Sequence, residues 1–282
     1  GTATVAAMGS ILIPAMVKQG YDPGFSSALS AISGSLGTVI PPSITFIIYG
    51  MITGESIGDL FLSGIVPGLI FAFVLCIMVF TQSKKHGWKG DTKRASAKEI
   101  GKLFLDTVWG LLSPVIVLGG IYSGLFTPTE AAAVAVVYSL IVGIFVYKEL
   151  RLKELKETLF STAKTTGMIL LIIMNAGIFS WVLTQQGIAA SLTEMALALT
   201  DNKYIMLFII NIVFLCAGCV MDNTSALYIL VPIIMPIAKA LDINMIQLGV
   251  ILVLNLSIGQ VTPPVGPNLY VAADIGKVKF EV

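Results

Sequence analysis

Two short segments of the sequence carry the groups most able to bind a small cation. Gly37 lies four residues before the proline pair 41–42, and Gly259 lies four residues before the pair 263–264. Proline lacks an amide hydrogen and clashes with the preceding turn, so each pair stops a helix and frees carbonyl oxygens. In hydrocarbon such groups persist only where protein, a polar cavity or an ion satisfies them. We therefore predict sodium ligands among the carbonyls of Gly37, Ile40, Pro42, Gly259, Thr262 and Pro264, the alternative being packing kinks without a ligand.

Polar residues ahead of these segments form a second candidate group. A carboxylate at mid-membrane depth costs about 2.5 to 3.5 kcal/mol, so Asp222 should face a cation, helix N-termini or water. It is either a cation ligand or the cap of the next helix, and both roles are compatible. Helices that begin at Thr2 and Thr224 would offer amide donors to a substrate carboxylate. The remaining candidates contact substrate or only join helices: Ser35, Ser225, Asn255 and Asn268.

The composition places these residues in a membrane protein. Of the 282 residues, 56% are apolar and only 12% are charged, and the mean hydropathy is +0.92. A soluble domain carries about one quarter charged residues. A net charge of +1 excludes the strongly basic class of nucleic-acid-binding proteins. No Walker sequence is present, so we expect no ATP hydrolysis. We also expect the protein not to be an enzyme and to hold no organic cofactor.

Long uncharged runs predict the membrane-spanning elements. A helix needs about 20 residues to cross a hydrocarbon core of roughly 30 Å. The runs of sufficient length are 23–54, 60–80, 107–129, 131–147, 165–193 and 243–273. The weaker runs 1–17, 204–221 and 223–238 are predicted to be half-crossings, and 188–200 to lie along the outer surface. The basic connectors 82–102 and 148–164 are predicted to be cytoplasmic, with a surface helix over 96–109.

An internal repeat relates the two proline-containing segments. Shifting the chain by 222 residues aligns GTVIPPS, from Gly37, with GQVTPPV, from Gly259, without a gap. Five predicted crossings separate the two copies, and an odd number inverts one copy relative to the other. This topology puts fifteen of the seventeen Lys and Arg residues in the cytoplasm. The predicted fold is an all-α polytopic membrane protein with inverted-topology repeats, each a re-entrant hairpin plus a broken transmembrane helix, as in elevator-type transporters.

The same pattern predicts how the chain divides into domains. Residues 1–54 form the first repeat of a transport domain, and residues 201–282 form the second. Residues 55–200 supply a scaffold and connecting helices with basic cytoplasmic loops. Thr127 and Glu130 fit a capping box with proline between them, so a helix is expected to start there, with Glu130 as a cap rather than a catalyst.

Several segments, among them TPTEAA from Thr127 and MDNTSA from Met221, resemble the large membrane subunit of tripartite ATP-independent periplasmic (TRAP) transporters. The resemblance covers essentially the whole chain and implies a sodium-coupled, elevator-type uptake permease for an organic acid such as a C4-dicarboxylate or sialic acid. It also implies the bacterial inner membrane as location, and as partners a small four-helix membrane subunit and a periplasmic substrate-binding protein. Family members extend beyond both ends of this chain, which is therefore expected to be a piece of a longer protein.

The family's sodium sites, carried onto this sequence, fall near the three residues of the first break and around Asp222, Asn223, Thr224 and the three residues of the second. Two other functions remain open on the sequence. One is a stand-alone divalent anion:sodium symporter that needs no binding protein. The other is a passive channel or structural membrane subunit.

Overall fold

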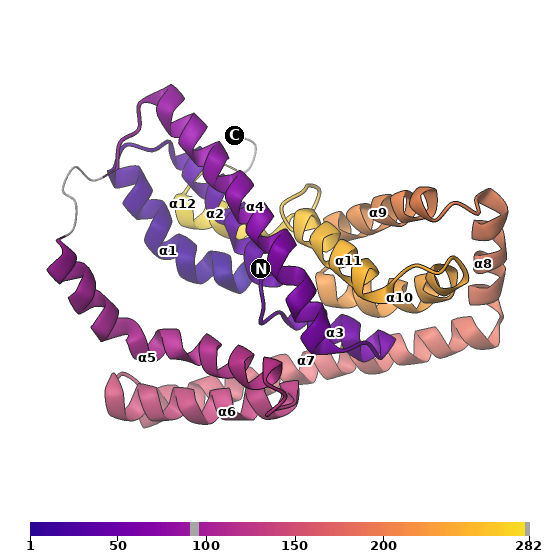
Figure 1. Cartoon of the computed structure of the whole chain (residues 1–282). Helices are drawn as coiled ribbons and strands as arrows, with labels where there is room; N and C mark the ends of the chain where they lie inside the picture. The colour runs from indigo at the N-terminus through magenta and orange to yellow at the C-terminus, as the bar shows by residue number, and fades with distance from the viewer. Residues whose placement is uncertain (91–95, 280–282) are drawn as a thin grey trace. The chain divides into compact units, whose positions relative to one another are not determined.

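The computed structural model of the chain describes residues 1–90 and 96–279, and within them the protein is entirely helical (Figure 1). Seven helices or helix pairs are long and apolar enough to cross a membrane. The prediction of an all-α polytopic membrane protein is thereby confirmed. The seven candidate spans are Pro23–Thr53, Ile57–His86, Ala97–Tyr122, Pro128–Val146, Lys153–Gln185, Lys203–Val220 and Asn223–Ala240.

The contacts separate the chain into two compact units, Gly1–Asp91 with Ala176–Val282, and Thr92–Asn175. The predicted transport domain and scaffold have other boundaries, and the domain division stays a prediction. Lys93 and Arg94 of the predicted basic connector lie outside the described residues.

In the second unit, two capping boxes start the helices. Ser96 caps α5 (Ala97–Tyr122) and Thr127 caps α6 (Pro128–Ile141), each with a glutamate that bonds back to the cap amide. The predicted role of Glu130 as a cap is confirmed, because its carboxylate accepts from the Thr127 amide at 2.8 Å. A π-helical turn, η1 (Val142–Val146), extends α6. The Tyr138 hydroxyl on α6 donates to the Trp109 carbonyl on α5 at 2.6 Å and joins the two helices.

Two boundaries differ from the sequence prediction. The expected surface helix 96–109 and the following span are one continuous helix, α5, which ends at Tyr122 because Gly124 turns the chain with φ of 72°. The run 165–193 is also divided. α7 (Leu152–Gln185) ends before Gly187, which has φ of 66°, and α8 (Ile188–Leu199) follows as the predicted separate helix. Hydropathy does not register such glycine turns, since glycine itself is uncharged and adopts positive φ freely.

The first unit is built around two interrupted helices. The first comprises α2 (Pro23–Val39) and α3 (Ile44–Thr53), and the second comprises α11 (Met245–Gly259) and α12 (Pro267–Gly276). Helix α1 (Thr2–Lys18) precedes the first interrupted helix, and α9 (Lys203–Val220) and α10 (Asn223–Ala240) precede the second. α12 packs against α1 and α2, while α3 packs against α10 and α11. Each second half-helix therefore packs against the helices of the other segment, and a shift of 222 residues exchanges these two sets of contacts.

Helix α4 (Ile57–His86) packs against the first interrupted helix at two glycines one helical turn apart. A Cβ on Gly64 would lie 2.6 Å from the Phe46 ring and 2.9 Å from the Val39 carbonyl oxygen. A Cβ on Gly68 would lie 2.7 Å from the Ile40 side chain. The backbone of α4 thus approaches residues 39–46, and only glycine leaves room for that approach.

We expect Gly64→Val to lower the stability of the permease by about 1 to 3 kcal/mol, because the added carbons would displace Phe46 and the Val39 carbonyl from a packed core. Thermal unfolding in detergent measures the effect. Gly119→Val is the matched control, since a Cβ at Gly119 meets nothing within 4 Å. Equal melting temperatures for the two variants would contradict the close packing of α4.

Candidate functional site

The first break lies between α2 and α3. Helical geometry pairs each carbonyl with the amide four residues later, so Pro41 and Pro42 deprive the carbonyls of Gly37 and Thr38 of their donors. The Thr38 carbonyl instead accepts from the Ser43 hydroxyl at 2.5 Å. For the Gly37 carbonyl, the residues that the structure describes supply no donor. One main-chain oxygen at this break is thus left for another ligand.

At the second break, between α11 and α12, Pro263 and Pro264 deprive the carbonyls of Gly259 and Gln260 of their helical hydrogen-bond donors. Both find donors within the chain: the Thr262 amide donates to Gly259 at 3.0 Å, and the Asn268 amide donates to Gln260 at 3.1 Å. The expectation that these proline-orphaned carbonyls need an ion is therefore too broad, because the tight turn over 259–262 supplies amides of its own. A carbonyl oxygen has two lone pairs, so these groups can still contact a cation.

A buried polar cluster joins the two interrupted helices, and its four central residues are paired by the 222-residue shift. Ser35 corresponds to Ser257, and Thr38 corresponds to Gln260. The Thr38 and Ser257 hydroxyls lie 2.5 Å apart, and both side chains are buried. Thr38 and Gln260 were not among the predicted site residues. They lie one turn after the paired serines on the same helix face, and this is the signal in the sequence that would have found them.

Asn268, on α12, completes this polar cluster. Its side-chain amide donates to the Ser35 hydroxyl at 3.0 Å and to the Gln260 side-chain oxygen at 3.3 Å. Asn268 is fully buried, yet the oxygen of its side-chain amide has no hydrogen-bond partner among the described residues. The structure thus brings the predicted residues Ser35 and Asn268 together, and it leaves one buried oxygen for which the described chain provides no partner.

The tip before α10 has a similar unpartnered group. The Asp222 carboxylate accepts from the Ser225 amide at 3.1 Å and from the Ser225 hydroxyl at 2.6 Å, so its predicted capping role is confirmed. Next to it, Asn223 is 6% exposed, and neither its side-chain oxygen nor its nitrogen has a partner among residues 1–90 and 96–279. A buried carboxamide normally has hydrogen bonds, and one without them is a candidate ligand-binding group.

The tip of α1 reaches both breaks. A Cβ on Gly37 would lie 2.8 Å from the Thr4 hydroxyl, and a Cβ on Gly1 would lie 3.0 Å from the Gln260 amide nitrogen. Gly1 has no side chain that could cap α1, so the first amides of this helix donate no hydrogen bond to a capping side chain. The side chain of Thr2, a predicted substrate contact, is exposed.

Asn255 forms a hydrogen bond to a neighbouring helix. Its side-chain amide donates to the Asn211 side-chain oxygen on α9 at 2.6 Å and to the Ile251 carbonyl at 3.1 Å. Of the two roles left open by the sequence, these contacts favour the joining of helices over substrate binding.

We expect the pair Asn211 and Asn255 to contribute about 0.6 kcal/mol of coupling energy, as polar pairs between membrane helices do on average. A double-mutant cycle with both residues changed to leucine, followed by thermal unfolding, measures it. The same variants should keep the sodium concentration at half-maximal uptake. A shift in that concentration without a coupling energy would place Asn255 in the ligand site instead.

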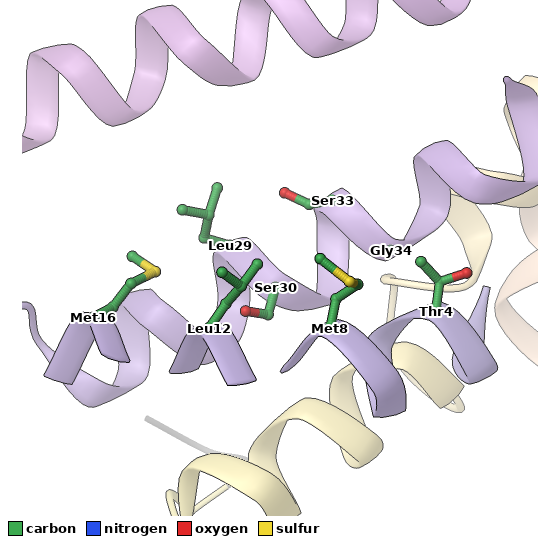
Figure 2. A pocket seen from close by; sticks show the side chains of 8 residues that line it. All are labelled: Thr4, Met8, Leu12, Met16, Leu29, Ser30, Ser33 and Gly34. Atoms are coloured by element: carbon green, nitrogen blue, oxygen red, sulfur yellow. The ribbon is translucent and has the colours of Figure 1, made fainter. Parts of the chain in front are cut away.

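A separate groove of about 250 Å³ lies between α1 and α2, and Figure 2 shows its lining side chains. Its lining is mostly thioether and aliphatic, with hydroxyls but no charged group: Thr4, Met8, Leu12, Met16, Leu29, Ser30, Ser33 and Gly34. Such a lining does not suit an organic anion. Under the 222-residue shift, Ser33 and Gly34 correspond to Asn255 and Leu256, which contact α9.

The comparison with known proteins agrees with the resemblance in the sequence. All 282 residues match the family described as "Tripartite ATP-independent periplasmic transporter, DctM component". The chain is 42% identical to the isethionate TRAP transporter permease protein DctMQ of Oleidesulfovibrio alaskensis, covering 100% of this chain and 44% of that protein. It is 43% identical to the C4-dicarboxylate TRAP transporter large permease protein DctM of Pseudomonas aeruginosa, covering 97% and 64%. It is 37% identical to the sialic acid TRAP transporter large permease protein SiaM of Vibrio cholerae, covering 99% and 65%.

The chain therefore spans less than two thirds of the length of each of these relatives. The family match nevertheless covers the whole chain, including both breaks and the tip before α10. The seven apolar helices agree with an integral protein of the inner membrane. The chain belongs to the DctM component family of tripartite ATP-independent periplasmic transporters.

Proposed function

We propose that the protein containing this chain takes up an organic acid across the bacterial inner membrane and couples this uptake to sodium entry. The named substrates of the relatives, isethionate, C4-dicarboxylates and sialic acid, are all organic acids. A periplasmic substrate-binding protein would deliver the acid, and a small membrane subunit would complete the permease, as the word tripartite implies.

The observation that carries this proposal is the buried polar cluster at the two breaks. Most of the surrounding core is apolar, yet within the described part of the chain the side-chain oxygen of Asn268 has no partner, and the Gly37 carbonyl at the first break has no donor. Sodium binds to neutral oxygens of this kind in interrupted membrane helices. The main-chain carbonyl oxygen of Gly37 and the side-chain oxygen of Asn268 are therefore the better supported sodium ligands. Ile40, Pro42, Thr262 and Pro264 remain further candidates.

The substrate anion would bind at the tip before α10. Asp222 occupies the amide of Ser225, which leaves the amides of Asn223 and Thr224 for an anion at this helix N-terminus. The buried side-chain amide of Asn223 would add another donor. A sodium ion close by would offset the repulsion between the substrate and the Asp222 carboxylate.

The proposed transport motion follows from the repeat. The exchange of α3 and α12 between the two segments supports inverted copies that form one body around the site. Alternating access would move this body relative to the remaining membrane helices. Binding of sodium at the breaks would order them before the substrate enters, because both ligands share the same half-helix ends.

Uptake by the complete permease in proteoliposomes tests the proposal. Isethionate, a C4-dicarboxylate and sialic acid are supplied with the binding protein, under an inward sodium gradient or an equal potassium gradient. We expect accumulation of one class of acid with sodium only. Uptake of free substrate without the binding protein would indicate a stand-alone symporter, and flux without any gradient dependence would indicate a passive channel.

A further inference from the structure

Helix α7 is longer than the membrane is thick. Its 34 residues correspond to about 51 Å at 1.5 Å per residue, whereas the hydrocarbon core measures about 30 Å. The part without Asp, Glu, Lys or Arg, residues 165–185, is alone about 31 Å long. This part fills the core, so the preceding residues, 152–164, extend about 20 Å into the headgroup layer and the water beyond.

The extending part has a basic, concave face. A shallow depression of about 590 Å³ is lined by Lys153, Lys156 and Lys164, together with Glu157, Phe160 and Ser161. Residues at these spacings share one side of a helix. The three lysines face a single acidic residue, and they form no ion pair with any residue that the structure describes. The depression is therefore an uncompensated cationic surface at the membrane boundary.

Depth and hydrophobicity indicate what covers this face. Lys164 directly precedes the uncharged part, so its ammonium group lies at the level of the lipid headgroups. Phe160 is one turn further out and 78% exposed, and an aromatic ring of this kind is typical of the membrane interface. Lys156 and Lys153 precede Lys164 and lie further from the membrane, and their long side chains extend toward the headgroups. A ligand for this face must combine an anionic group with an apolar part.

We propose that this face of α7, formed by Lys153, Lys156, Phe160 and Lys164, binds an anionic phospholipid of the cytoplasmic leaflet. The phosphate and the anionic headgroup contact the lysines, and Phe160 lies beside the headgroup and glycerol backbone at the membrane interface. The positive-inside rule places this basic end in the cytoplasm, where anionic lipid is available. Bound lipid would fix the depth of α7 in the bilayer.

Lipid binding to the complete purified permease tests the proposal. Phosphatidylglycerol is titrated against a background of phosphatidylcholine, and bound lipids are counted by native mass spectrometry. We expect the wild type to prefer phosphatidylglycerol and each Lys→Gln change at these three positions to weaken that preference about fivefold. The triple Lys→Arg variant should retain it, because it keeps the charge.

The matched control removes three other lysines: K84Q, K85Q and K98Q together. The proposal is overturned if this control loses as much binding as K153Q/K156Q/K164Q, or if the latter binds like the wild type. Glycerol phosphate at millimolar concentration should not displace the lipid. Full displacement by glycerol phosphate would identify a soluble phosphate ligand, and binding of another protein subunit to the lysines in lipid-free detergent would identify a protein partner. Either result would contradict a lipid site.

Discussion

Sodium-driven uptake is expected to fall about 10- to 100-fold in the Asn223→Ala permease, which should remain folded. The Asn223 carboxamide is buried and has no partner among the residues that the structure describes, so its removal costs little stability. In the proposed loaded state it hydrogen-bonds to a charged ligand, and such bonds contribute about 1.5 to 3 kcal/mol. Initial rates in proteoliposomes, measured at saturating sodium over a range of substrate concentrations, report the loss.

Asn175→Ala serves as the control for this change. Asn175 lies exposed on α7, and its side-chain amide bonds only to the carbonyl of Leu171 one turn earlier. We expect this variant to transport at the wild-type rate. If Asn223→Ala also transports normally, the tip before α10 is not the substrate site, and the unpartnered carboxamide has only a packing role.

The second large effect is expected at Asn268. In sodium-free buffer, Asn268→Leu should shift the free energy of unfolding by no more than about 1 to 2 kcal/mol. It loses hydrogen bonds to Ser35 and Gln260, but it also removes a buried oxygen without a partner. Added sodium should stabilise the wild type by about 2.7 kcal/mol at one hundred times the dissociation constant. In the variant this stabilisation should largely disappear.

Ser257→Ala distinguishes a ligand from a structural contact. It removes the hydrogen bond to Thr38 within the same cluster but leaves Asn268 in place. The free energy of unfolding of Ser257→Ala should be lower than that of the wild type by a similar amount with and without sodium. The variant therefore keeps the stabilisation by sodium. Loss of that stabilisation in Ser257→Ala, together with its retention in Asn268→Leu, would mean that the unpartnered oxygen of Asn268 does not hold the ion.

The interrupted helices could be predicted from the sequence because their cause is local. Pro41 and Pro263, each followed by a second proline, cannot occupy a helix interior, and the chain breaks at both pairs. The caps at Thr127 and Asp222 were predictable for the same reason, since a cap bonds to an amide two or three residues away. Uncharged length also located five of the seven candidate spans, whereas Lys203–Val220 and Asn223–Ala240 were predicted as half-crossings, and the predicted run 243–273 is divided into two shorter helices at the second proline pair.

Most contacts of the buried polar cluster could not be predicted, because they join segments far apart in the chain. Ser43 satisfies the Thr38 carbonyl from only five positions away, but Asn268 approaches Ser35 from 233 positions away. Asn211, which binds Asn255, sits in an apolar helix where nothing in its neighbours marks it. Such contacts are fixed by packing, and only the repeat, which pairs Thr38 with Gln260, offered a guide.

Binding of radioactive sodium to the complete purified permease tests most directly whether the breaks hold the coupling ion. We predict saturable binding that an equal concentration of potassium does not displace, and a clear loss of affinity in Asn268→Leu but not in Ser257→Ala. Absence of saturable binding, or equal affinity in the wild type and Asn268→Leu, would contradict a sodium site at the buried polar cluster.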